Sequence, residues 1–228
     1  MCVMEVIDLS MPIGPHFRWA TELEITGDIS AGDDFRVTRL RGAACHGFTH
    51  VDARAHFVAH APTIEQTPLS QVVGPCRVLN LRNAAPNTEI GAAELDAADP
   101  GGPEGEILLL STGWNTRRDY TTPLFWTEAP WLTRDAAEWL ATRRPTAVAF
   151  DFPQDYTIRL LLAGKRPPKV DHVTHDVLLR NGVTLIEYLI NTSQLTQPRT
   201  FLCAAPLLIP NADGAPARVF AINNLVER

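Results

Sequence analysis

A dense group of metal-binding side chains lies in one stretch of eleven residues, His46-Gly47-Phe48-Thr49-His50-Val51-Asp52-Ala53-Arg54-Ala55-His56. Three of the seven histidines of the protein lie here, with one carboxylate among them. Small or apolar residues fill the gaps, so the stretch is not a solvated charged loop. Imidazole and carboxylate together are the ligands of a divalent transition metal such as zinc, manganese or iron.

The spacing of these side chains favours an extended chain. His46, His50, Asp52 and His56 all occupy even positions, which share one face of a strand, whereas on a helix Asp52 would point away from the histidines. Same-face neighbours lie ~6–7 Å apart, so His50 and Asp52 can bind one ion. His46 lies about 13 Å from His50 along an extended chain and can join them only if the chain bends, for which Gly47 is the obvious place. The stretch is therefore predicted to be a strand that kinks into a loop, with its ligands turned inward.

The whole chain has the composition of an ordinary globular protein, and we expect a single domain over residues 1–228. A formal net charge of −6 without a basic run argues against nucleic acid as a partner. The longest apolar runs, near residues 107–110 and 201–209, are too short to span a membrane.

The N-terminus and the cysteines predict a cytoplasmic protein. Glu5 and Asp8 stand where a signal peptide would carry basic residues and a long apolar core. The four cysteines, Cys2, Cys45, Cys76 and Cys203, form no CxxC pair and are expected to be reduced thiols.

Short apolar runs alternate with helical patterns along the rest of the chain. Strands are predicted over residues 3–9, 35–40, 76–81, 106–110 and 147–150, and a short helix or turn over 67–74. Helices are predicted over 88–97, capped by Thr88, and over 133–142, capped by Thr133. Residues 117–130 are predicted to be a long loop. A helix between two apolar strands indicates an α/β layer.

A second constellation follows at Asp171-His172-Val173-Thr174-His175. Thr174 is predicted to cap a helix that ends at Asn181-Gly182. Beyond it, Glu187 stands in an apolar run, where an unpaired buried carboxylate would be costly. Either Glu187 faces water from an amphipathic strand, or it reaches the ion held by the first stretch, with His175 beside it.

These residues resemble the cyclase family of metal-dependent hydrolases, which includes bacterial arylformamidases (kynurenine formamidases) and isatin hydrolases. The family signature His-x-Gly-Thr-His-x-Asp-x-Pro-x-His is matched by His46 to His56. The remaining landmarks are spread over nearly the whole chain: Asp8-Leu9-Ser10, Ser111-Thr112-Gly113-Trp114, Ala149-Phe150-Asp151, His175, Leu178-Leu179, Gly182 and Glu187.

The resemblance implies a ligand set and a fold. In arylformamidase-like members the positions of His46, His50 and Asp52 bind one metal, and Asp52 bridges to a second held by His175, with Glu187 touching both. The ions are Zn²⁺ or Mn²⁺, one or two in number. The implied fold is a mixed-sheet α/β domain of the swivelling β/β/α type, in a homodimer or homotetramer.

Three positions depart from the family pattern. Phe48 stands in place of the motif glycine, Arg54 in place of the proline, and Gln154 where relatives often have serine. We expect Phe48 and Arg54 to border the substrate, together with Trp19 from an aromatic and cationic loop. Arg54 is predicted either to pair with a substrate carboxylate or to form a structural ion pair.

The expected function is hydrolysis of an amide C–N bond in a small aromatic substrate, such as N-formylkynurenine. The metal lowers the pKa of a bound water to produce hydroxide, and His56 carries the proton to the leaving nitrogen. Two alternatives stay open: opening of a cyclic amide, cyclisation or dehydration at the same metal, and a metal-binding module without catalysis.

Overall fold

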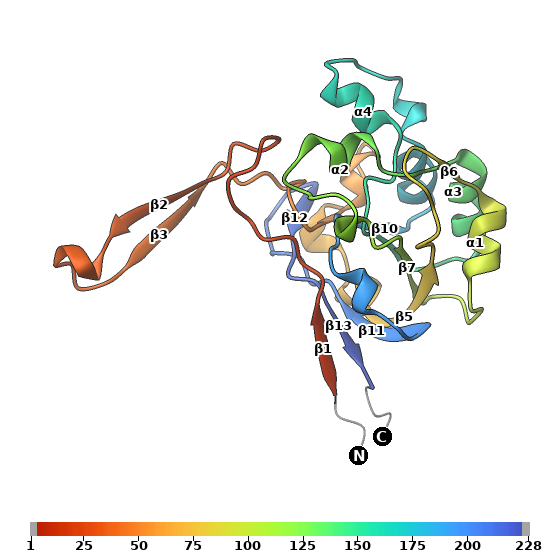
Figure 1. The fold of residues 1–228 in the computed structure, drawn as a ribbon, viewed down its shortest axis with the longest axis horizontal. Helices are drawn as coiled ribbons and strands as arrows, with labels where there is room; N and C mark the ends of the chain where they lie inside the picture. The colour runs from red at the N-terminus through yellow and green to blue at the C-terminus, as the bar shows by residue number, and fades with distance from the viewer. Residues whose placement is uncertain (1–3, 225–228) are drawn as a thin grey trace.

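The computed structural model describes residues 4–224 and has the predicted mixed α/β architecture (Figure 1). Its main sheet has nine strands, in this spatial order: β1 (Glu5–Asp8), β13 (Phe220–Asn223), β11 (Arg199–Cys203), β5 (Val73–Asn80), β7 (Ile107–Ser111), β9 (Ala147–Phe150), β10 (Thr184–Glu187), β4 (His50–Asp52) and β12 (Gly214–Pro216). Two small sheets pair β2 (Glu22–Gly27) with β3 (Val37–Arg41), and β6 (Glu89–Ile90) with β8 (Trp131–Leu132).

The centre of the main sheet is parallel and its flanks are antiparallel. Strands β5, β7, β9 and β10 run parallel to one another, whereas β11 pairs antiparallel with β5, β4 pairs antiparallel with β10, and β12 pairs antiparallel with β4. Every residue of β7 and β9 is buried, because a central parallel strand is covered on both faces. Their continuous apolar sequences follow from this double burial.

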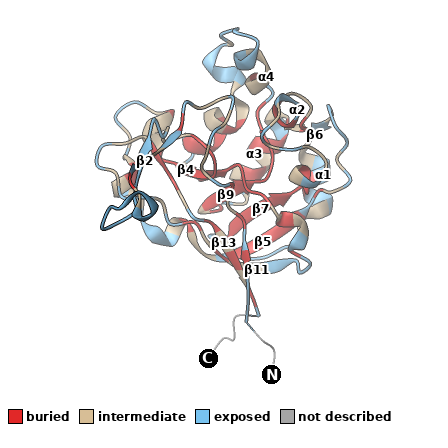
Figure 2. Cartoon of the chain, turned by 60° about the vertical axis from the view of Figure 1, so that its left-hand side comes forward, coloured by how far each residue is buried: buried red, intermediate tan, exposed pale blue. Residues whose placement is uncertain are grey.

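The core forms two layers, one on each side of the sheet. On one side, Leu108 and Leu110 of β7 pack with Leu95 of α1 (Ala92–Ala98) and Leu140 of α3 (Arg134–Thr142). The alternate residue Leu109 belongs to the other layer, because successive side chains of a strand point to opposite faces. That layer also takes in side chains of β1, β13, β4 and β12, so the outer strands curl over the centre of the sheet. Figure 2 shows the buried strands running through the middle of the molecule.

Most predicted elements are confirmed with small shifts of their ends. The helix predicted over 133–142 is α3, and the strands predicted over 76–81, 106–110 and 147–150 are β5, β7 and β9. Residue 3 of the first predicted strand lies outside the described residues. The predicted cap at Thr88 is wrong: α1 begins after Gly91, whose backbone N–H donates to the Glu94 carboxylate at 3.0 Å.

Two further predictions are corrected. The segment predicted as a long loop contains α2 (Pro123–Thr127), which is too short to show a helical period but begins with proline at its first position. The helix predicted after Thr174 is a π-helical turn, η7 (His175–Leu179), and Thr174 does not cap it because its own backbone is helical. Helix α4 (Thr157–Leu162) was not predicted.

Short 3-10 turns connect the elements: η1 (Ile29–Ala31), η2 (Arg54–His56), η3 (Ile64–Gln66), η4 (Leu69–Gln71), η5 (Trp114–Thr116), η6 (Lys169–Asp171) and η8 (Thr192–Gln194). The hairpin formed by β2 and β3 projects from the body of the molecule (Figure 1). Within the described residues, no helix is long and apolar enough to cross a membrane.

Candidate metal centre

Strand β4 supplies the first two side chains of the centre. His50 and Asp52 lie on one face of the strand, while Val51 between them is buried in the core on the other. The antiparallel pairing of β4 with β10 sets Glu187 directly opposite His50. Glu187 is 3% exposed, so the alternative in which it faces water is excluded.

The chain bends just before β4, as the spacing predicts, but the left-handed residue is Phe48 (φ 59°) and not Gly47. The Phe48 ring is buried against Trp19, with ring centroids 4.5 Å apart, and this packing holds a backbone conformation that phenylalanine rarely adopts. The bend returns His46 to Asp52, and its Nδ1 lies 2.7 Å from Asp52 Oδ1.

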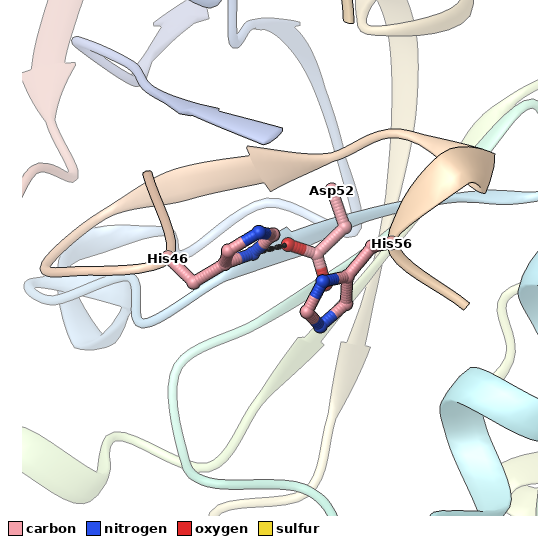
Figure 3. A group of neighbouring side chains, drawn as sticks. All are labelled: His46, Asp52 and His56. Carbon is pink, nitrogen blue, oxygen red and sulfur yellow. Dashed lines mark hydrogen bonds and ion pairs between the residues drawn. The ribbon is translucent and has the colours of Figure 1, made fainter. Parts of the chain in front are cut away.

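After β4, the turn η2 brings His56 back to the same place. The rings of His46 and His56 stack with centroids 3.8 Å apart, and Figure 3 shows both pointing towards the Asp52 carboxylate. Asp213, on the chain just before β12, contacts both rings. Its Oδ2 is 3.1 Å from His56 Nδ1 and 2.9 Å from His46 Nε2.

Asp52 is the common centre of the ligand atoms. Its Oδ1 lies 3.1 Å from His50 Nε2, and its Oδ2 lies 3.5 Å from His175 Nε2. Glu187 faces the same two nitrogens, with Oε2 3.7 Å from His50 and Oε1 3.4 Å from His175. The five predicted ligands are thus brought together from β4, the bend before it, η7 and β10.

Hydrogen bonds behind the centre orient two of the imidazoles. His50 Nδ1 donates to the Phe48 carbonyl at 2.8 Å, and His175 Nδ1 contacts Asp155 Oδ2 at 2.7 Å. Each bond keeps a ring hydrogen on Nδ1, so that the Nε2 facing Asp52 is the nitrogen that would supply a lone pair to a metal. Gln154 Nε2 donates to Glu187 Oε1, which gives this departure from the family pattern a contact within the centre.

The electrostatics of the centre are those of carboxylates held among imidazoles. Burial raises the pKa of Asp52, but the His50 charge and hydrogen bonds from His175 and His46 outweigh it and hold this pKa well below the usual value. Burial lowers the pKa of His46, but contacts with Asp52 and Asp213 outweigh it and raise this pKa to about 9. For His175, burial is likewise outweighed by Asp155 and Asp52, so its pKa is raised well above 6.5. The carboxylates therefore attract positive charge into this site.

The donor set fits a divalent metal. Asp52 Oδ2 and His46 Nε2 are buried and meet no partner in good hydrogen-bond geometry, although His175 Nε2 and Asp213 Oδ2 lie 3.5 Å and 2.9 Å away, and such poorly satisfied buried polar atoms are uncommon. Two overlapping groups have their ligand atoms within 4.8 Å of one another: His46, Asp52 and His56, and His50, Asp52 and Glu187. Nitrogen and oxygen donors of this kind suit zinc and manganese.

The centre opens into a cavity of about 500 Å³. None of the three residues predicted to contact substrate lines it. Phe48 is buried in the core, Trp19 packs behind it, and the Arg54 guanidinium donates to the carbonyl of Leu179 at 3.1 Å. Substrate contact by these residues stays a prediction.

Sequence reasoning missed several residues of the site. Asp155 and Asp213 position histidines, and Arg18 and Tyr188 line the cavity. Arg18 stood in the aromatic and cationic loop that the sequence singled out, whereas the two aspartates carried no local pattern.

Comparisons with known proteins agree with this geometry. The model of the family described as "Putative cyclase" matches residues 7–154. Kynurenine formamidase of Bordetella petrii is 27% identical over 207 residues, which are 91% of this chain and 86% of the relative. Kynurenine formamidase of Geobacillus thermodenitrificans is 28% identical over 179 residues, which are 76% of this chain and 74% of the relative.

Two solved structures share the fold. One, described as a "potential metal-dependent hydrolase with cyclase activity", has a TM-score of 0.73 and 28% identity, covering 99% of this chain and 100% of that chain. An isatin hydrolase bound to the product analogue thioisatinate has a TM-score of 0.81 at 19% identity, covering 96% and 92%.

Proposed function

Because the chain belongs to the cyclase family, we propose that it is a metal-dependent hydrolase that cleaves an amide C–N bond in a small aromatic substrate. The finer form of the proposal is an arylformamidase, which converts N-formylkynurenine to kynurenine and formate. Two relatives with this name match most of the chain, which supports the choice of substrate.

The convergence of two carboxylates and three imidazoles on one buried point carries the proposal. Asp52 and Glu187 are both at most 3% exposed, and two buried carboxylates without a cation would be costly. A divalent cation bound there supplies Lewis acidity and a nucleophile from water at neutral pH. We propose Zn²⁺ or Mn²⁺, and the two ligand groups that share Asp52 leave the number of ions at one or two.

His56 is the residue of the site best suited to move a proton. Its side chain is 29% exposed, whereas the His50 side chain, which also lines the cavity, is 1% exposed. Asp213 fixes the ring through Nδ1, so Nε2 is the atom that takes up a proton and passes it to the leaving nitrogen. His56 therefore lies beside the ligand imidazoles and is distinguished from them by its greater exposure and by its contact with Asp213.

The cavity walls supply the contacts that an aromatic amide needs. Phe57, Tyr188 and Ile158 offer apolar surface around the polar centre. A ring held against these side chains would present its amide to Asp52 and His56. The cavity can also exclude part of the bulk water, which strengthens the electrostatic contacts inside it.

Turnover of N-formylkynurenine by the metal-replete protein tests the proposal. A chelated sample and Asp52→Asn serve as controls, because each should abolish hydrolysis. Hydrolysis that survives chelation would contradict a metal-dependent reaction. A protein that holds metal but releases no formate would contradict the formamidase, and turnover of isatin by that protein would then favour opening of a cyclic amide.

A further inference from the structure

Arg18 is a cavity residue whose charge the proposed chemistry does not use. Among residues 4–224 its guanidinium forms no ion pair with a carboxylate, its polar neighbour is the Tyr188 hydroxyl, and its Nη1 is buried without a hydrogen-bond partner. The other long cationic side chain of the cavity, Lys169, is exposed and donates to the Phe57 carbonyl at 2.6 Å. Burying a hydrogen-bond donor without an acceptor costs free energy. We therefore expect the acceptor for Arg18 Nη1 to come from a bound ligand.

Three aromatic rings hold the Arg18 guanidinium in place. Its Cζ lies 4.0 Å from the ring centre of Trp126, 5.0 Å from that of Trp19 and 5.8 Å from that of Tyr188. Stacking on aromatic faces uses the flat side of the guanidinium and leaves the N–H groups at its edge free. The group is therefore fixed in orientation and still able to donate.

The position of Arg18 relates it to the metal centre. Tyr188 packs against the ligand His50, with ring centroids 5.2 Å apart, and Arg18 lies against the same Tyr188 ring. Both Arg18 and Tyr188 line the cavity into which the centre opens. The Arg18 cation and the ligand His50 thus contact the same Tyr188 ring and face the same cavity.

We propose that Arg18 is a specificity-determining residue that binds a carboxylate of the substrate, so that the enzyme selects aromatic amides that carry one. This inference rests on the proposed hydrolase function and adds the chemical class of its substrate. The edge of a guanidinium matches a carboxylate with two parallel N–H···O bonds. The carboxylates of the centre face imidazoles, so they do not compete for Arg18.

Ligand binding tests this role separately from catalysis. The probes are kynurenine and its carboxamide, which differ only in the charge of the group expected to meet Arg18. Calorimetry on the metal-loaded protein should give ~10- to 100-fold tighter binding of kynurenine, the range for hydrogen bonds to a charged group. Arg18→Met should abolish this preference and leave the affinity for the carboxamide unchanged, while Arg18→Lys should keep part of it.

Arg143→Met is the matched control, since Arg143 ends α3, pairs with Asp96 at 2.7 Å and does not line the cavity. Equal affinity of the wild-type protein for the two probes, or a preference that persists in Arg18→Met, would overturn the inference. So would an equal loss for both probes, which would make Arg18 a packing residue. Carboxylate preference without turnover of N-formylkynurenine would overturn the formamidase and support the role of Arg18.

Discussion

Replacing Asp155 by asparagine should weaken metal binding although Asp155 is not a predicted ligand. Asp155 accepts two hydrogen bonds, from the Thr174 backbone N–H at 2.9 Å and from His175 Nδ1 at 2.7 Å. Asparagine has a single acceptor oxygen, so it can satisfy only one of these donors. If the oxygen stays with Thr174, the amide nitrogen faces His175, and the imidazole must carry its hydrogen on Nε2.

That tautomer is incompatible with the centre. His175 Nε2 lies 3.5 Å from Asp52 Oδ2 and 3.4 Å from Glu187 Oε1, which is where a metal would take its lone pair. Loss of an orienting partner behind a metal-binding histidine typically costs 10- to 100-fold in affinity, or about 1.4–2.7 kcal/mol. We expect a loss of this size for Asp155→Asn, with little change in shape because the two side chains have the same size.

Competition with a chromophoric chelator measures the metal affinity directly. The matched control is Asp171→Asn, an exposed aspartate at the end of η6 only four residues before His175. The control should bind metal as tightly as the wild-type protein. If Asp155→Asn also binds metal with wild-type affinity while remaining folded, then His175 is not a ligand oriented through Asp155, and the reasoning is wrong.

Four other predictions follow from the site. His56→Ala should keep its metal and lose ~10²- to 10⁴-fold in turnover, measured by metal content and formate release; loss of metal would make His56 a ligand. Glu187→Gln should lower metal occupancy markedly, and unchanged occupancy would place Glu187 outside the centre. Metal uptake at pH 7 should release protons, because the pKa of His46 is raised to about 9 in the metal-free protein; the calorimetric heat of binding should therefore depend on the buffer. The same raised pKa stabilises the fold of the metal-free protein, fully so below about pH 6.5. This stabilisation should disappear as the pH rises through about 9. Gly214→Ala should weaken metal binding and lower the denaturation midpoint, since an added Cβ would lie 2.6 Å from His46 Cε1; unchanged values of both would show that the ring can move aside.

Local pattern predicted the parts of the centre that lie on strands. The even spacing of His50 and Asp52 fixes their common face, and the apolar run around Glu187 left two alternatives, a carboxylate facing water or one reaching the metal, of which the buried strand β10 confirms the burial. These inferences need only the period of a strand and the cost of a buried charge. The pairing of β10 with β4 then completed the set without any further signal in the sequence.

The supporting residues could not be predicted in this way. Asp155 lies 20 residues from His175, and Asp213 lies 157 residues from His56, so no periodicity relates them. The bend at Phe48 shows a different limit, because local preference favours glycine there and the packing of the ring against Trp19 overrides it. The cavity walls come from several distant segments, which is why the residues predicted to contact substrate do not line it.

The position of β4 between β10 and β12 has a consequence for biosynthesis. Glu187 leaves the ribosome roughly 130 residues after His56, which takes at least several seconds at ~5–20 residues per second. During that interval the nascent chain displays histidines and one aspartate on a strand that still lacks both of its neighbours. A complete binding pocket exists only after both β10 and Asp213 have emerged. Loading with the correct ion therefore has to wait for them, and a chain that stops before β10 retains an incomplete chelating segment.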